Sequence, residues 1–132
     1  MIVVDTSAWV EFLRDTGSTV CDAVDQLLDD DLAICDAISM AVLAGARDEE
    51  HLGRLRSLLA RTTLVTIAAA DYDRAAALYR ICRRQGETVR KLIDCLIAAV
   101  AIRVDSAVLH SDADFTTLAR HTPLTIHPTS PT

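Results

Sequence analysis

The sequence predicts an α/β fold in which helices cover both faces of a parallel β-sheet. Short apolar runs alternate with helical segments along the whole chain, and this alternation is typical of parallel strands joined by right-handed helical crossovers. The run Ile2-Val3-Val4 is continuously apolar and β-branched, as in a strand covered on both sides. Residues 92–104 are apolar around almost the whole helical circumference, which indicates a helix buried in the core.

Each element can be placed in order from its pattern and flanking residues. Thr6 or Ser7 is expected to cap a first helix, Ser18 a second, and Asp36 a third helix that ends at Gly45. The predicted strands are 2–4, 32–35, 64–67, 107–110 and 124–126, and the predicted helices are 8–14, 18–28, 37–44, 48–61, 71–84, 92–104 and a short one ending at residue 120.

A chain of 132 residues has room for one domain with one core, which we place at residues 1–127. The tail 128–132 contains two prolines and is expected to be frayed. No window reaches the ~18 apolar residues of a membrane span, and the chain opens directly on a strand. We therefore expect a cytoplasmic protein with no membrane association. The four cysteines have no C-x-x-C spacing, which favours structural thiols over a zinc site or disulfides.

The net charge of −6 argues at first against nucleic acid as a partner. The acidity is local, however, because residues 15–36 hold seven of the nineteen acids and no base, and the rest of the chain has twelve acids against thirteen bases. Within that remainder, residues 80–91 form a basic strip whose only acid is Glu87. Its bases are Arg80, Arg83, Arg84, Arg90 and Lys91. Phosphate contacts would explain the strip. A solvated helix end would explain Arg83 and Arg84 equally well.

Two acids stand out by their surroundings. Asp5 ends the first strand, at the sheet edge where open α/β folds bind ligands, so it is a candidate metal ligand; a carboxylate that only caps or starts a turn is the alternative. Asp94 lies in the most apolar helix, where an uncompensated carboxylate would be very unfavourable. A cation, an arginine such as Arg90, or the helix N-terminus could compensate it, so that capping stays open for Asp94 as well.

Asp112 and Asp114 directly follow the fourth strand, and should lie on the same sheet edge as Asp5 if the first and fourth strands are neighbours. With Asp94 they would offer three or four carboxylates in one crevice. Hard oxygen donors of this kind suit Mg²⁺ or Mn²⁺. Ser111-Asp-Ala-Asp114 is also a good turn sequence, and a turn alone would explain these two acids.

Three segments together resemble the PIN-domain family and, within it, the VapC-type toxins of bacterial toxin–antitoxin pairs. They are Ile2-Val-Val-Asp-Thr-Ser-Ala-Trp9, the segment Arg83 to Ala99 around Asp94, and His110-Ser-Asp-Ala-Asp-Phe115. The resemblance implies a five-stranded parallel sheet in a three-layer α/β/α fold. It also implies Mg²⁺-dependent endoribonuclease activity, homodimerisation and inhibition by a small antitoxin, with structured RNA such as a tRNA loop as a reasonable substrate.

The resemblance also implies roles for single residues. Asp5, Asp94 and Asp112 match the metal-binding acids of the family, and Asp114 matches a further acid that often assists. Thr6 and Ser7 match hydroxyl positions beside the first Asp, where with Arg84 and Arg90 they are candidates for substrate binding. Hydrolysis of a phosphodiester by such a site needs no histidine base. His110 is expected to be a structural residue at the end of a strand.

One position departs from the family pattern. The family places a Glu in the helix after the second strand, and Ala41 occupies that position here. Asp36 is more than one helical turn away and is not expected to replace it. The chain is then either naturally weakened or carries Ala41 in place of a Glu that was replaced to allow production of a toxic nuclease. In both cases we expect little activity.

Other functions fit less well or differ in class. A haloacid-dehalogenase-like phosphatase needs a second Asp two residues after the first, where this chain has Ser7, and a receiver domain needs paired acids that are absent. A binding module that complexes an antitoxin without cleaving RNA stays open. Apolar helix faces around Trp9, Phe12, Leu13 and residues 55–59 could accept a partner helix, or could be ordinary core or a dimer contact.

Overall fold

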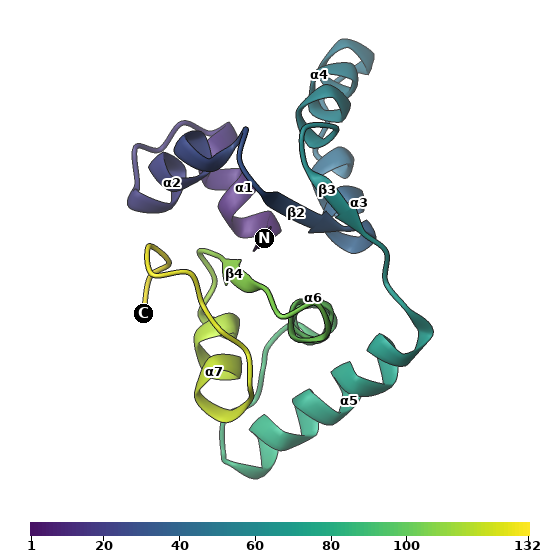
Figure 1. The fold of residues 1–132 in the computed structure, drawn as a ribbon, viewed down its shortest axis with the longest axis vertical. Helices are drawn as coiled ribbons and strands as arrows, with labels where there is room; N and C mark the ends of the chain where they lie inside the picture. Colours follow the sequence, from purple (N-terminus) through teal and green to yellow (C-terminus); the bar gives the residue numbers. More distant parts are fainter.

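The computed structural model describes residues 1–132 and contains a four-stranded parallel sheet surrounded by helices (Figure 1). The strands are β1 (Ile2–Val4), β2 (Leu32–Cys35), β3 (Thr63–Val65) and β4 (Ala107–Leu109). The helices are α1 (Thr6–Leu13), α2 (Thr19–Leu27), α3 (Asp36–Ala44), α4 (Glu49–Leu59), α5 (Ala69–Arg84), α6 (Leu92–Arg103) and α7 (Ala113–His121). The α/β fold with a parallel sheet is therefore confirmed.

The sheet order β3-β2-β1-β4 makes the first and fourth strands neighbours, which is the condition for Asp5 and Asp112 to lie on one sheet edge. Val3 lies opposite Val108 and Val4 opposite Leu109, so that β1 and β4 end at the same level. The amide of Asp5 continues this pairing by donating to the Leu109 carbonyl at 3.0 Å. The register thus brings Asp5 and the segment after Leu109 to one edge of the sheet.

The helices form two groups, with α1 packed on α2, and α5, α6 and α7 packed on one another. Figure 1 shows these groups above and below the strands, with α3 and α4 beside β2 and β3. Helix α6 is enclosed, because all residues from Asp94 to Ala101 are buried. The predicted core helix is confirmed, and it is this helix that carries a carboxylate into the interior.

The helix caps differ in part from expectation. Ser18 caps α2 as predicted, since its side chain accepts from the Cys21 amide. Asp5, rather than Thr6 or Ser7, is the N-cap of α1. The expectation that Asp36 caps α3 is wrong: the N-cap is Cys35, and the Asp36 carboxylate accepts from the Ile67 amide instead. Asp36 therefore ties α3 to the loop after β3 and does not face the site.

The expected fifth strand, residues 124–126, is reduced to a single bridge between Val108 and Ile126. Two backbone hydrogen bonds surround that bridge, from Val108 to Thr125 and from His127 to Val108. Pro123 and Pro128 lie close on either side, and a proline cannot donate to a strand ladder, which explains why the pairing does not extend.

The tail 128–132 is not wholly frayed, because Ser130 is buried. Its hydroxyl accepts from the His110 amide at 3.1 Å, so the tail is held against the end of β4. The four cysteines are free and buried, as expected of structural thiols. None of the helices combines the length and apolarity that crossing a membrane would require.

Candidate metal centre and its cleft

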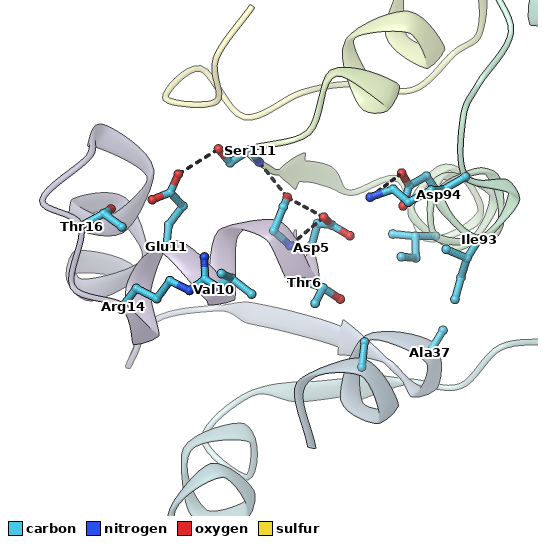
Figure 2. A pocket seen from close by; sticks show the side chains of 14 residues that line it. Asp5, Thr6, Val10, Glu11, Arg14, Thr16, Ala37, Ile93, Asp94 and Ser111 are labelled. Atoms are coloured by element: carbon cyan, nitrogen blue, oxygen red, sulfur yellow. Dashed lines mark hydrogen bonds and ion pairs between the residues drawn. The ribbon is translucent and has the colours of Figure 1, made fainter. Parts of the chain in front are cut away.

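A cleft of about 490 Å³ opens at the carboxyl edge of the sheet, where α1, α3, α6 and the loop after β4 meet (Figure 2). Its lining comes from segments far apart in the sequence and consists of Asp5, Thr6, Ser7, Val10, Glu11, Arg14, Thr16, Ala37, Ala41, Lys91, Ile93, Asp94, Ile97 and Ser111. Asp5 and Asp94 thus share one cleft, although Asp5 follows the first strand and Asp94 lies in α6, far along the chain.

Three carboxylates form a tight cluster beside this cleft. One oxygen from each of Asp94, Asp112 and Asp114 lies within 4.8 Å of the other two. They come from the first turn of α6 and from the start of α7, two helices that pack against each other. Asp5 lies outside this tight group, but it is close enough to raise the pKa of Asp94 by charge repulsion.

Asp94 is buried, and one of its two carboxyl oxygens has no hydrogen-bond partner. It sits in the first turn of α6, whose N-cap is Lys91, and its Oδ2 atom has no hydrogen-bond partner. Burial, followed by the neighbouring Asp114 and Asp5 carboxylates, raises the pKa of Asp94 to about 8. Helix capping therefore does not account for this residue.

Asp112 and Asp114 are both tied to the backbone. Asp112 is the N-cap of α7 and accepts from the Asp114 amide at 2.9 Å. Asp114 accepts from the backbone amides of Arg90 and Lys91, at 3.0 and 2.9 Å. Burial tends to raise the pKa of each carboxyl, but the hydrogen bonds from these neighbours outweigh it and hold both pKa values below the ordinary range.

Asp5 is braced by hydroxyl groups. Its Oδ2 accepts from the Ser7 amide at 2.9 Å and from the Ser7 hydroxyl at 2.6 Å. Ser7 Oγ in turn accepts from the Ser111 amide, and Ser111 donates to Glu11, so that a chain of hydrogen bonds runs along the cleft wall (Figure 2). Burial raises the pKa of Asp5 above its ordinary value.

Two cations lie over the acid cluster. The Lys91 ammonium donates to Asp112 Oδ2 and lies 3.7 Å from Asp94 Oδ2. The Arg90 guanidinium lies 3.4 Å from both Asp112 Oδ1 and Asp114 Oδ1. Both side chains remain more than half exposed, at 56% for Lys91 and 71% for Arg90. The cluster is thus covered on its open side by positive charge.

The remaining candidates are divided between the cleft and the outer surface. Ala41 and Thr6 line the cleft together with Asp5 and Asp94. Ser7 also lines it, but its hydroxyl is committed to Asp5 and Ser111. Arg84 is exposed in the last turn of α5 and is not among the residues lining the cleft.

His110 has the structural position expected of it. It is fully buried, and its Nδ1 accepts from the Asp112 amide at 3.0 Å. Burial lowers its pKa, so the ring is neutral at pH 7. Through its side chain and its backbone amide, His110 joins Asp112 to the buried Ser130.

Sequence reasoning missed Glu11, Ser111 and Ser130 as parts of this site. The spacing of Glu11 four residues after Ser7, on one face of α1, was a signal for the first of them. No local pattern reveals the other two, because the partners of Ser111 lie 100 and 104 residues away and that of Ser130 lies 20 residues away.

Comparison with known proteins gives matches over nearly the whole chain. Residues 2–121 match the sequence family described as the PIN domain. Over 128 residues the chain is 45% identical to VapC ribonuclease Mb1587 of Mycobacterium bovis and to Ribonuclease VapC11 of Mycobacterium tuberculosis, a stretch that covers 94% of this chain and 96% of each relative.

Solved structures share the fold at low identity. A VapBC2 structure from Rickettsia felis, bound to a DNA fragment from its promoter, matches with a TM-score of 0.77 and 18% identity, over 96% of this chain and 98% of that one. VapC20 of Mycobacterium tuberculosis, described as a sarcin–ricin loop cleaving toxin, matches with a TM-score of 0.65 and 14% identity, over 88% of this chain and 93% of that one. These two matches bear on the fold alone.

Proposed function

Since this chain belongs to the PIN-domain family and, within it, to the VapC-type ribonuclease toxins, we propose that it is a divalent-metal-dependent endoribonuclease whose active site is the cleft beside Asp94. The observation that carries this proposal is the cluster of Asp94, Asp112 and Asp114, with one oxygen from each within 4.8 Å of the others. A cytoplasmic site of action is part of the proposal, because the substrate is RNA.

The residues present fit a hard divalent ion. The donors are carboxylate oxygens without histidine or cysteine, a set that suits Mg²⁺ or Mn²⁺. The buried Oδ2 of Asp94 lacks any hydrogen-bond partner, which an ion would supply. Asp94 and Asp112 would hold the ion, with Asp5 facing the same cleft. Asp114 is already engaged by two backbone amides, so its main role would be to fix the chain around Lys91.

The other residues of the cleft would bind and orient the RNA. An Mg²⁺ or Mn²⁺ ion held here would supply Lewis-acid chemistry for hydrolysis of the phosphodiester. Arg90 has an exposed guanidinium above the acids and would contact a phosphate oxygen. Thr6 would offer a hydroxyl from the floor of the cleft, and Ser7 would keep Asp5 in place. Structured RNA with an unpaired loop, such as a tRNA loop, fits so small a site.

Ala41 is proposed to leave this form weak or inactive. Its methyl group lines the cleft where the family pattern has a Glu, and a methyl group cannot bind a cation. The substitution Ala41→Glu should raise Mg²⁺-dependent RNA cleavage by about a hundredfold or more, the scale of effect expected from restoring a metal-site group. Cleavage of an RNA pool with and without EDTA measures this, and equal inactivity of both proteins would count against the assignment.

A silent antitoxin-binding module is the second candidate. A groove of about 420 Å³ adjoins the cleft and is lined by the exposed Leu13, by the buried Val42 and Leu55, and by Arg14 and Arg47. An amphipathic helix of an antitoxin would fit such a groove. Trp9 and Leu59 are core residues that do not line this groove. Antitoxin binding without cleavage, even by the Ala41→Glu protein, would favour the module.

Homodimerisation is a further part of the proposal that the family resemblance supports. Light scattering of the isolated chain across a range of concentrations tests it directly. A mass of one chain throughout that range would restrict assembly to the complex with an antitoxin.

A further inference from the structure

The lysine over the acid cluster occupies the place that a divalent ion needs. Lys91 Nζ donates to Asp112 Oδ2 and lies 3.7 Å from Asp94 Oδ2, so one ammonium spans two of the three clustered carboxylates. Lys91 is also a residue that lines the cleft. Its backbone amide is fixed by Asp114, which anchors the base of the side chain while the ammonium end remains half exposed.

We propose that Lys91 is a built-in counter-ion of the metal-free site, which leaves the carboxylates when a divalent ion binds and then serves as a phosphate ligand for RNA. The proposal rests on the proposed function, since it assumes that Asp94 and Asp112 hold an ion. The proposal gives Lys91 one role in the metal-free protein and another in the metal-bound protein. The charge pattern of the sequence does not distinguish Lys91 from the other bases nearby.

The first half of the proposal follows from charge. Without a cation, Asp94, Asp112 and Asp114 would repel one another at these distances. Lys91 reduces that repulsion in the metal-free protein, and for the same reason it competes with a metal ion for the same oxygens. Lys91 therefore stabilises the empty site and weakens ion binding.

The second half follows from geometry. The side chain of Lys91 has a long flexible stem and a fixed base, so the ammonium can move from the carboxylates into the adjoining cleft without any backbone change. An ammonium displaced in this way lies at the rim where a phosphate would bind, next to the Arg90 guanidinium. The number of cations available to RNA thus rises by one when the ion is bound.

Metal binding by Lys91→Met tests the first half. Titration calorimetry with Mn²⁺ should show about fivefold tighter binding than in the parent chain, the scale of a half-exposed ion pair. Thermal unfolding without metal should occur at a lower temperature in Lys91→Met, and added Mn²⁺ should raise that temperature more than in the parent chain. Lys91→Arg, which keeps the charge, should bind Mn²⁺ like the parent.

RNA binding tests the second half. With Mn²⁺ at saturation, Lys91→Met should bind a fluorescent stem-loop RNA several-fold more weakly, in spite of its tighter metal binding. Arg56→Met is the matched control, because Arg56 is an exposed base on α4 outside the cleft and its loss changes the net charge equally. It should leave both affinities unchanged.

Asp94→Asn separates failure of the inference from failure of the proposed function. If Asp94→Asn loses Mn²⁺ binding while Lys91→Met binds Mn²⁺ like Arg56→Met, the metal site stands and the role of Lys91 is overturned. If Asp94→Asn binds Mn²⁺ like the parent chain, the proposed metal site itself is wrong. Absence of Mn²⁺ binding by Lys91→Met would overturn the inference as well.

Discussion

Asp5 and Asp112 each perform two tasks that sequence reasoning treated as alternatives. Each accepts from a backbone amide at the start of a helix, and each also belongs to the acidic site or its cleft. The capping bond uses one oxygen of each carboxylate, so the other remains free to face the cleft or a cation. At each of these two positions, one carboxylate both caps the start of a helix and belongs to the acidic site or its cleft.

Asp94 is different, because its Oδ2 atom caps no helix and has no hydrogen-bond partner. We predict that Asp94→Asn abolishes Mn²⁺ binding and, without divalent ions, raises the free energy of unfolding by about 1–2 kcal/mol at pH 7.5, since a buried and repelled carboxyl is replaced by a neutral group of the same shape. Urea unfolding of both proteins measures the change. Asp25→Asn, at an exposed position of α2, is the control and should change stability by less than ~0.5 kcal/mol.

The sequence singles out these acids as candidates, but it does not reveal which residues contact them. Asp5, Asp94 and Asp112 stand at strand ends or in an apolar helix, and these are local signals. The contact of Lys91 with Asp112 depends on how α6 meets α7, which no local pattern contains. For the same reason Arg84 and Arg90 look alike in sequence, although only Arg90 reaches the acids.

At the scale of elements, α5 and α6 are joined outside the site by an ion pair between a buried aspartate and a partly exposed arginine. Asp71 is buried at the start of α5, accepts from the Ala68 amide, and receives Arg103 from the last turn of α6 at 2.9 Å. The hydrogen bond from Arg103 is the main cause that lowers the pKa of Asp71. One carboxylate therefore caps one helix and anchors the end of the next.

This pair predicts a dependence of stability on pH. Because the pKa of Asp71 is lower in the folded chain than its ordinary value of 3.8, the pair stabilises the fold above about pH 4, and this contribution is lost as pH falls further. Asp71→Asn should lower the free energy of unfolding by about 2 kcal/mol at pH 7 and by much less at pH 3. Urea unfolding at the two pH values checks this. Asp73→Asn on the exposed side of α5 should show no such difference.

The C-terminal segment predicts a second effect at this scale. Ser130→Ala would leave the buried His110 amide without its acceptor, so the free energy of unfolding should fall by about 1 kcal/mol. Thr132→Ala, at an exposed position of the same segment, should leave it unchanged. Equal stability of Ser130→Ala and the parent chain would show that the tail does not hold the end of β4. The composition of this short terminal segment indicated fraying, and nothing in the sequence shows that Ser130 is buried.

The fold class could be predicted because it follows from apolar periodicity and chain alternation, whereas the order of the strands came from the structure. The number of strands was overestimated by one. Leu124-Thr-Ile126 has the composition of a strand, but Pro123 and Pro128 limit it to one bridge with Val108. The composition of a segment shows that it can form a strand. Whether the strand pairs over its length depends on the backbone N–H groups available in and beside it, and proline has none.

For the whole molecule, the net charge of −6 limits RNA binding to a few local contacts. We expect the logarithm of the RNA association constant to fall with the logarithm of salt concentration with a slope of about −2, equivalent to roughly three phosphates. Arg90→Gln should reduce the size of this slope by about 0.7, and Arg56→Gln should not. Fluorescence anisotropy in Mn²⁺ over a range of KCl concentrations gives both values. A slope that Arg90→Gln leaves intact would remove Arg90 from the interface.

The hydrogen bond between Ser7 and Ser111 joins positions 104 residues apart. It links the segment that carries Asp5, early in the chain, to the segment that carries Asp112, late in the chain. A ribosome making this chain releases Asp5 early and Asp112 only after more than a hundred further residues. Nascent protein that is stalled or truncated before that point lacks the late carboxylates and the loop that braces the early one. The proposed cleavage activity therefore requires a chain that has been synthesised past Asp112, and before that point an inhibitory partner has no assembled site to block.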